Sequence, residues 1–200
     1  MRLLLASASP RRADLLRAAG IDFDTLAVDI DERVRAGETP EDYVRRLASE
    51  KSVAGLNAAL KGSRHNSSEA SRHDDVVVLG ADTVVVVDGA ILGKPRDEDD
   101  ARRMIGLLSG RRHDVLTGVS LRGGGRELAR MATTAVFLAR MSNADVAWYV
   151  KSGEGRDKAG AYAIQGLASR FVERIEGSYS NVVGLPVAVV QTLLEELNIV

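Results

Sequence analysis

The chain has 200 residues, of which 45% are hydrophobic and 28% are charged, and its formal net charge is −1. This composition is ordinary for a globular protein and suits one domain, or one domain with a small lobe. The near-zero charge argues against a dedicated nucleic-acid-binding protein, which usually carries a strong basic excess. Cysteine is absent, which excludes disulfides, thiolate zinc sites and cysteine nucleophiles. No apolar run approaches the roughly 18 residues of a membrane span and the N-terminus lacks a cleavable signal pattern, so we expect a cytoplasmic protein.

The first two predicted elements are a strand and a helix that follows it directly. The apolar run 3–6 predicts a short buried strand, and Ser9 followed by Pro10 is typical of a helix N-cap and first helical position. Unpaired N–H groups and the positive end of the helix dipole attract anions at such a point, and Arg11 and Arg12 add bidentate donors. The stretch therefore suits a phosphate group, although a capped helix with two solvated arginines fits the pattern as well.

A strand, an acidic cluster and a long helix are predicted next. We expect a strand over 23–28, which leads into the acids of segment 29–32. Thr39 is a good N-cap and Pro40 suits the first helical position, and apolar residues at helical spacing carry this helix into the high fifties. Residues 62–75 are polar and show no periodicity, so they predict a mobile surface loop.

The second half of the chain mixes strands and helices. The β-branched run 76–79 predicts a strand that is interrupted at 80–83 and resumes over 84–87, followed by a hairpin turn at Asp88-Gly89. The further elements expected are a short strand at 90–92, a helix at 98–108 capped by Asp97, long strands at 115–121 and 128–139 joined through 123–125, a helix capped by Ser142, a strand at 171–175 and a last helix from 185–186. Hairpins together with crossover connections predict an α/β fold on a mixed sheet.

A few polar residues are candidates for chemistry. Asp82 lies in an apolar stretch, where a carboxylate must pair, accept hydrogen bonds or bind metal, although the backbone N–H groups of a turn could also hold it. Glu32 could complete a Mg²⁺ site with Asp82, or be a solvated acid. Lys94, between a glycine and a proline, and Lys51, on the long helix, are either ligand-binding or simply exposed. Gln165 is either structural or an amide that reads a base edge.

Seven short motifs together resemble the Maf family of nucleoside triphosphate pyrophosphatases, although each motif alone is weak. They occur in family order along nearly the whole chain, which makes the set specific, and no P-loop or dinucleotide-binding glycine loop is present. The motifs are Ser7-Ala8-Ser9-Pro10-Arg11-Arg12, Glu50-Lys51, Gly80-Ala81-Asp82-Thr83-Val84-Val85, Gly93-Lys94-Pro95, Leu108-Ser109-Gly110 with His113 and Thr117-Gly118-Val119, the segment 157–166, and the segment 177–186.

The resemblance implies a fold and a reaction. The fold is of the inosine-triphosphatase-like α/β type, a single domain over 1–200 with a cleft between two lobes. The reaction is hydrolysis of a nucleoside triphosphate to the monophosphate and pyrophosphate, assisted by Mg²⁺ or Mn²⁺. Arg12, Thr83 and Gln165 match the branch that resembles the dTTP/UTP pyrophosphatases, and the family makes a homodimer the expected assembly.

The resemblance also suggests a role for each site residue. Asp82 matches the family's proposed proton acceptor and would activate a water molecule that attacks the α-phosphorus. Glu32 and Asp82 would hold the metal ion, and Gln165 would read the pyrimidine edge. The residues expected to bind the triphosphate are Ser7, Ser9, Arg11, Arg12, Lys51 and Lys94.

Other functions stay open at this point. The same enzyme could act on modified pyrimidine nucleotides, with dTTP and UTP only convenient substrates. The family has also been described as an inhibitor of septum formation, so a nucleotide-sensing regulator of cell division is an alternative. A nucleic-acid-binding module is disfavoured by the charge balance and by the low aromatic content of 4%.

Overall fold

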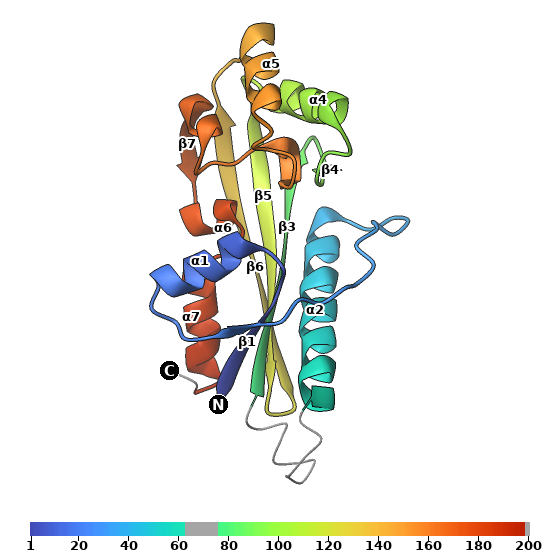
Figure 1. Ribbon diagram of the computed structural model, residues 1–200, viewed down its shortest axis with the longest axis vertical. Helices are drawn as coiled ribbons and strands as arrows, with labels where there is room; N and C mark the ends of the chain where they lie inside the picture. The colour runs from blue at the N-terminus through green and yellow to red at the C-terminus, as the bar shows by residue number, and fades with distance from the viewer. Residues whose placement is uncertain (63–75, 199–200) are drawn as a thin grey trace. The chain divides into compact units, whose positions relative to one another are not determined.

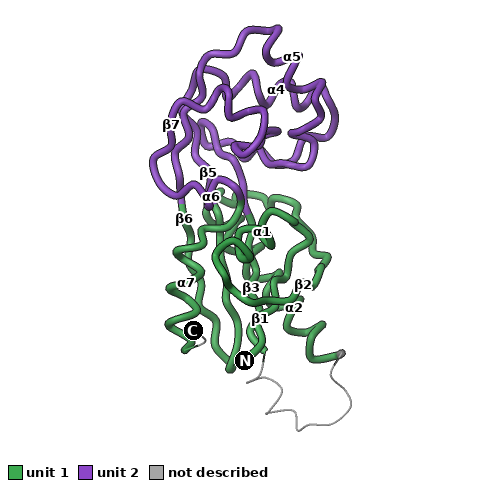
Figure 2. The backbone as a smooth tube through the Cα atoms, turned by 60° about the vertical axis from the view of Figure 1, so that its left-hand side comes forward, with its two compact units in different colours: residues 1–82, 117–132, 184–200 green, residues 83–116, 133–183 purple. Residues whose placement is uncertain are grey.

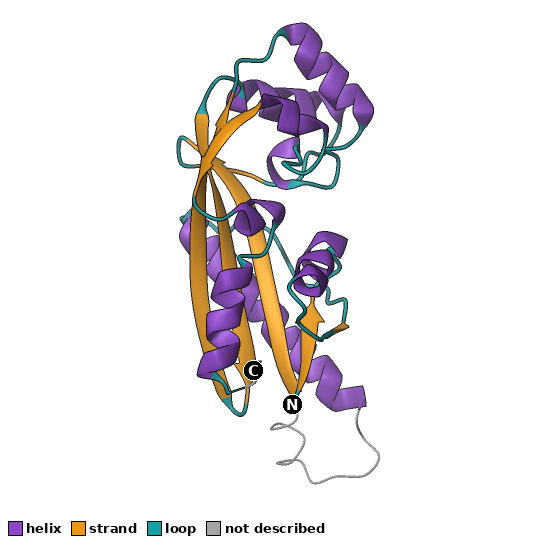
Figure 3. Ribbon diagram, turned by 90° about the vertical axis from the view of Figure 1, so that its left-hand side faces the viewer, coloured by secondary structure: helices purple, strands orange, loops and turns teal. Residues whose placement is uncertain are grey.

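The computed structural model describes residues 1–62 and 76–198, and its helices and strands are drawn in Figures 1 and 3. The predicted loop 62–75 lies outside the described residues from position 63 onward. The strands are β1 (Arg2–Ala6), β2 (Asp24–Thr25), β3 (Val76–Val87), β4 (Ala90–Leu92), β5 (Arg112–Gly123), β6 (Arg126–Leu138) and β7 (Val172–Glu176). The α-helices are α1 (Pro10–Ala18), α2 (Pro40–Gly62), α4 (Glu98–Leu108), α5 (Asn143–Ser152), α6 (Tyr179–Val183) and α7 (Val187–Glu196), and short 3₁₀ helices cover Ala159–Ala161 and Leu167–Phe171.

The strands form one mixed sheet, as the sequence predicts. Its order is β2-β1-β3-β5-β6-β7, and β4 pairs with β3 outside this path. β1 runs parallel to both β2 and β3, with Leu5 opposite Leu79, whereas the β3–β4 and β6–β7 pairs are antiparallel. Parallel neighbours need a crossover through a helix, and antiparallel neighbours can be joined by a tight turn, so the mixture reflects both kinds of connection.

The chain divides into two compact units, which Figure 2 colours separately. The first comprises residues 1–82, 117–132 and 184–200, and the second comprises residues 83–116 and 133–183. The long strands β3, β5 and β6 contribute residues to both units. Each unit has its own buried apolar core. Within residues 1–62 and 76–198, no helix combines the length and the apolar character that a membrane span requires.

Strand alternation decides which helix covers which face of the sheet in the first unit. Successive side chains of a strand point to opposite faces. The odd-numbered residues of β1 and β3 pack with α1 and α7, and the even-numbered ones pack with α2 (Figure 1). The first group contains Leu3, Leu5, Val77, Leu79 and Ala81, and the second contains Leu4, Ala6 and Val78. Asp82 continues the even-numbered series, so its side chain belongs to the face that α2 covers.

Two glycines let the backbone of α2 lie directly on this face. A Cβ atom on Gly80 of β3 would overlap the carbonyl oxygen of Ala48, and one on Gly118 of β5 would overlap that of Val44. β3 and β5 are neighbours in the sheet, so the two gaps lie under adjacent turns of the helix. Any side chain at either position would push the helix away from the sheet. The close contact therefore fixes the distance between α2 and β3, and with it the part of β3 that the side chains of α2 can contact.

The predicted helix N-caps are largely confirmed. The side chains of Thr39, Asp97 and Ser142 each accept a hydrogen bond from the backbone N–H three residues on, over 3.1, 2.8 and 3.2 Å. The Asp88-Gly89 turn is confirmed too, because both residues have positive φ, of 50° and 75°, as a type I′ hairpin requires.

Some element boundaries differ from the prediction. β3 runs through 80–83 without the predicted interruption, because Gly80 and Asp82 both face α2 and are accommodated there. The strand predicted over 23–28 is reduced to β2, and α2 continues beyond the high fifties to Gly62. The short helix α6 was not predicted, since five residues are too few to show a hydrophobic period.

Candidate active site

The first predicted site element, the turn from β1 into α1, is organised by Ser7 and Arg12. The Ser7 hydroxyl oxygen accepts hydrogen bonds from the Ser9 backbone N–H at 3.2 Å and from Nη1 of Arg12 at 3.1 Å. Nε of Arg12 donates to the carbonyl oxygen of Gly184 at 2.8 Å. Ser9 has the extended backbone of an N-cap, but its hydroxyl makes no capping hydrogen bond within the described residues. The prediction that Ser9 occupies the N-cap position is therefore confirmed, although the hydrogen bond at this turn is accepted by the Ser7 hydroxyl.

Arg12 is a nearly buried cation close to two acids. It is 8% exposed, whereas its neighbour Arg11 is half-buried. Burial lowers the pKa of Arg12, the negative charges of Asp82 and Glu32 raise it, and the positive charge of Arg11 lowers it further. These opposing influences place the Arg12 guanidinium within electrostatic range of both acids.

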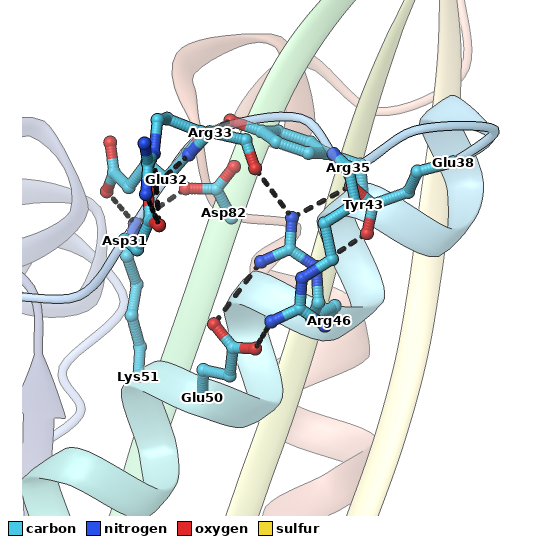
Figure 4. Close-up of polar contacts among 10 residues, drawn as sticks. All are labelled: Asp31, Glu32, Arg33, Arg35, Glu38, Tyr43, Arg46, Glu50, Lys51 and Asp82. Atoms are coloured by element: carbon cyan, nitrogen blue, oxygen red, sulfur yellow. Dashed lines mark hydrogen bonds and ion pairs between the residues drawn. The ribbon is translucent and has the colours of Figure 1, made fainter.

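Lys51 joins the two predicted acids. Its Nζ lies 2.6 Å from Oδ1 of Asp82 and 2.7 Å from Oε1 of Glu32 (Figure 4). The side chains of Lys51 and Asp82 are 9% and 10% exposed, whereas that of Glu32 is 48% exposed. Asp82 reaches Lys51 because its even-numbered position in β3 faces α2. Asp82 therefore lies inside a strand and pairs with a side chain. The alternative prediction, a turn aspartate held by backbone N–H groups, is wrong.

The segment 29–38, which we call the Glu32 loop, is fastened to α2. The hydroxyl of Tyr43 donates to the carbonyl oxygen of Glu32 at 2.8 Å. Arg46 binds both carboxylate oxygens of Glu38, at 2.5 and 2.8 Å, and donates to the carbonyl oxygen of Arg33 at 3.1 Å. Figure 4 shows these side chains converging on the loop from α2. Neither Tyr43 nor Arg46 was among the predicted site residues.

A signal for these two residues was present in the sequence. Tyr43, Arg46 and Glu50 are spaced three and four residues apart, so they share one face of a helix. The spacing of Tyr43 places it on the apolar face of the helix, and it is only 8% exposed. Its hydroxyl points to the Glu32 loop nevertheless, since tyrosine joins an apolar ring to a polar tip.

The remaining predicted site residues belong to the second unit. Thr83 is half-buried and follows Asp82 in β3. Lys94 is exposed in the connection between β4 and α4, and Gln165 is exposed just before the second 3₁₀ helix. The backbone N–H of Gly160 donates to the carbonyl oxygen of Gly93 at 3.0 Å, which ties the segments that carry Lys94 and Gln165 together.

Comparison with known proteins decides the family. Residues 2–197 match the family described as Maf-like protein. The chain belongs to the Maf family. A dTTP/UTP pyrophosphatase of Anaeromyxobacter dehalogenans (strain 2CP-C) is 50% identical to this Maf protein over 197 residues, covering 96% of this chain and 92% of the relative. A dTTP/UTP pyrophosphatase of Shewanella sp. (strain MR-7) is 47% identical over 204 residues and is covered completely, as is this chain.

A solved structure supports the fold. The Ham1 protein of Staphylococcus aureus has a TM-score of 0.50 to this Maf protein at 15% sequence identity, covering 98% of this chain and 99% of that chain. At this identity the likeness concerns the fold alone. It confirms the predicted α/β architecture with a mixed sheet flanked by helices.

The acids of this Maf protein suit a divalent cation that is completed by substrate and water. In residues 1–62 and 76–198 there is no cluster of three or more His, Asp or Glu side chains able to hold a metal ion. Glu32 and Asp82, however, both direct an oxygen atom at one cationic group, the Lys51 ammonium. Mg²⁺ is commonly bound by one or two carboxylates together with waters and phosphate oxygens. The two acids therefore fit such an ion, although they do not enclose it.

Proposed function

We propose that this Maf protein hydrolyses dTTP and UTP to the monophosphate and pyrophosphate. The observation that carries the proposal is the row Asp82–Lys51–Glu32, which lies in the same unit as the buried cation Arg12. Relatives that are 45–50% identical over nearly the whole chain are named dTTP/UTP pyrophosphatases. The reaction needs cations that bind a highly charged anion and a carboxylate base next to it, and this unit contains both kinds of group.

The cations are proposed to bind the triphosphate. A nucleoside triphosphate carries about four negative charges, which a chain of net charge −1 must meet locally. Arg11 and Arg12 stand at the start of α1, where backbone N–H groups also favour phosphate. Lys51, Lys94 and the hydroxyls of Ser7 and Ser9 complete the proposed set.

Asp82 is proposed as the general base. A water oxygen bonds to the α-phosphorus while the bond from that phosphorus to the bridging oxygen breaks. The water proton passes to the Asp82 carboxylate, and the bridging oxygen leaves with the pyrophosphate. Nearly complete burial of Asp82 keeps the carboxylate directed at one position rather than at bulk solvent.

Glu32 and Asp82 are proposed to hold Mg²⁺ or Mn²⁺. When bound, such an ion neutralises negative charge that develops on the phosphate oxygens. The carboxylate of Glu32 is the more exposed of the two. It can therefore release the Lys51 ammonium and bind an incoming metal–nucleotide complex with little rearrangement of the core.

Arg12, Thr83 and Gln165 are proposed to set the preference for pyrimidines. The amide of Gln165 offers both a donor and an acceptor to a base edge. A homodimer and a cytoplasmic location complete the proposal. Sedimentation of the purified protein tests the first, and fractionation of cells tests the second.

Pyrophosphate release by the purified protein tests the proposed reaction. We expect metal-dependent pyrophosphate from dTTP and UTP, and a loss of about 10²- to 10⁴-fold in Asp82→Asn. Asp22→Asn removes the same charge at an exposed loop position and should retain the wild-type rate. Release of single phosphate would contradict attack at the α-phosphorus. A comparison of kcat/KM for ordinary and modified pyrimidine triphosphates shows which class is the better substrate.

A further inference from the structure

Glu32 lies in a segment whose conformation is not stabilised by regular secondary structure. The Glu32 loop between β2 and α2 contains neither helix nor strand, and the Glu32 side chain is half-exposed. Holding a residue of such a segment in one conformation requires free energy of about 1–2 kcal/mol for the backbone alone. Its carboxylate nevertheless lies 2.7 Å from the Lys51 ammonium. Side chains outside the loop must therefore hold its backbone in this conformation.

Tyr43 supplies one of these contacts at the residue itself. Its hydroxyl donates to the carbonyl oxygen of Glu32 at 2.8 Å, from a ring that is 8% exposed. A phenol is protonated at neutral pH, so the Tyr43 hydroxyl is a hydrogen-bond donor to this carbonyl.

Arg46 supplies a second contact on the far side of Glu32. Its guanidinium binds Glu38 through two parallel contacts of 2.5 and 2.8 Å and also reaches the carbonyl oxygen of Arg33 at 3.1 Å. The side chains of Arg46 and Glu38 are only 13% and 8% exposed, so water screens the pair weakly. The hydrogen bond from Arg46 lowers the pKa of Glu38 to about 2. The pair therefore remains charged at neutral pH.

We propose that Tyr43 and Arg46 are positioning residues that hold the Glu32 carboxylate against Lys51 and Asp82. The two side chains fix the carbonyl groups of Glu32 and Arg33, which are consecutive along the loop. Fixing two adjacent peptide units leaves the Glu32 side chain few directions in which to extend. Lys51 lies two helical turns beyond Tyr43, so one helix carries both the anchors and the group that Glu32 meets. The inference rests on the proposed function of Glu32 and names residues that this function does not assign.

Two variants remove the anchors with little change in volume. Tyr43→Phe deletes only the hydroxyl, and Arg46→Lys keeps the charge but loses the planar fork that binds both oxygens of Glu38. Arg45→Lys is the matched control, because Arg45 is the neighbouring arginine of α2, has a half-exposed side chain, and forms an ion pair with Asp42 at 3.9 Å. Glu32→Gln serves as the reference for complete loss of the carboxylate.

Three measurements are compared across these proteins. Hydrogen exchange of the amides in 29–38 should rise about three- to tenfold in Tyr43→Phe and Arg46→Lys, as the loss of one hydrogen bond implies, while exchange in α1 stays unchanged. The dissociation constant of Mn²⁺, followed by electron paramagnetic resonance without nucleotide, should rise in the same two variants and most in Glu32→Gln. The metal concentration for half-maximal pyrophosphate release should rise in parallel, with kcat at saturating metal near the wild-type value.

The results separate this inference from the proposed function. Unchanged exchange in 29–38, or equal effects of Arg45→Lys and Arg46→Lys, would overturn the positioning role. Faster exchange with an unchanged Mn²⁺ dissociation constant would also overturn it, because the anchors would then stabilise the loop without directing Glu32. If the wild-type protein releases no pyrophosphate, the proposed function fails by itself, and exchange and Mn²⁺ binding still decide the inference.

Discussion

Lys51 and Asp82 form a nearly buried ion pair, with Nζ and Oδ1 separated by 2.6 Å, that joins helix α2 to strand β3. The pair exists because the helix backbone lies against Gly80, two residues before Asp82 on the same face of the strand. Lys51 also meets Glu32, so the ammonium group stands where the two proposed metal ligands converge.

Replacing Lys51 by methionine should weaken both folding and activity. The substitution leaves the carboxylate of Asp82 nearly buried without its cationic partner, which typically costs about 3–5 kcal/mol when one side of a buried pair is removed. We expect the midpoint of urea unfolding to fall accordingly. Lys151→Met, at an exposed position of α5, should change the unfolding free energy by no more than about 0.5 kcal/mol.

A double-mutant cycle isolates the pair itself. Asp82→Asn removes the charge that Lys51→Met leaves behind, so the double variant should be more stable than the sum of the single losses predicts. A coupling free energy above about 0.5 kcal/mol is expected for groups in contact. Strictly additive losses in urea unfolding would show that the ion pair does not contribute to stability.

Gly80→Ala should destabilise the protein although alanine is the smallest possible addition. The new Cβ would overlap the carbonyl oxygen of Ala48 in α2, and overpacking of this kind typically costs about 1–3 kcal/mol. The helix must move to relieve the overlap, so Lys51 should also lose its contact with Asp82. Thermal unfolding and pyrophosphate release, measured on the same preparation, should both decline.

Gly106→Ala is the opposite case on an exposed face of α4. A Cβ there meets no atom within 4 Å, and alanine favours a helix over glycine by about 0.5–1 kcal/mol. This variant should be at least as stable as the wild-type protein and equally active. Equal stability of the two alanine variants would contradict the account of α2 resting on Gly80.

The sequence predicted the family and most elements of the fold because those depend on local patterns. The β-branched run of β3, the caps at Thr39, Asp97 and Ser142, and the turn at Asp88-Gly89 all involve residues close together in the chain. The Maf family and the mixed α/β sheet are confirmed. The roles proposed for the individual site residues stay predictions.

The partners of the site residues could not be predicted, since they depend on how elements meet in space. Nothing near Arg12 in the sequence indicates that its Nε binds the carbonyl oxygen of Gly184, 172 positions away. The pairing of Lys51 with Asp82 likewise depends on the depth at which α2 lies on the sheet, which Gly80 and Gly118 determine. The apolar spacing of Tyr43 concealed the hydrogen bond that its hydroxyl makes.

Acid should destabilise the protein through His113. This side chain is 1% exposed, and its Nε2 lies 2.8 Å from the hydroxyl of Tyr162. Burial, and secondarily the positive charge of Arg112, lowers the pKa of His113 from 6.5 to about 4. The unfolded chain therefore binds a proton more readily than the folded one between these values. Stability from this group is present above pH 6.5 and is lost as the pH falls toward 4.

His113→Gln separates this effect from that of the many carboxylates. An amide can keep a hydrogen bond to the Tyr162 hydroxyl but does not titrate, and the carboxylates contribute equally to both proteins. We measure the unfolding free energies of wild type and variant by urea unfolding from pH 7 to 4. Over this range the wild type should lose up to about 3 kcal/mol more than the variant. A difference independent of pH would mean that His113 is protonated in the folded protein as readily as in the unfolded chain. Burial in an apolar core opposes that outcome, because the charged imidazolium would lose its hydration and would be repelled by the positive charge of Arg112.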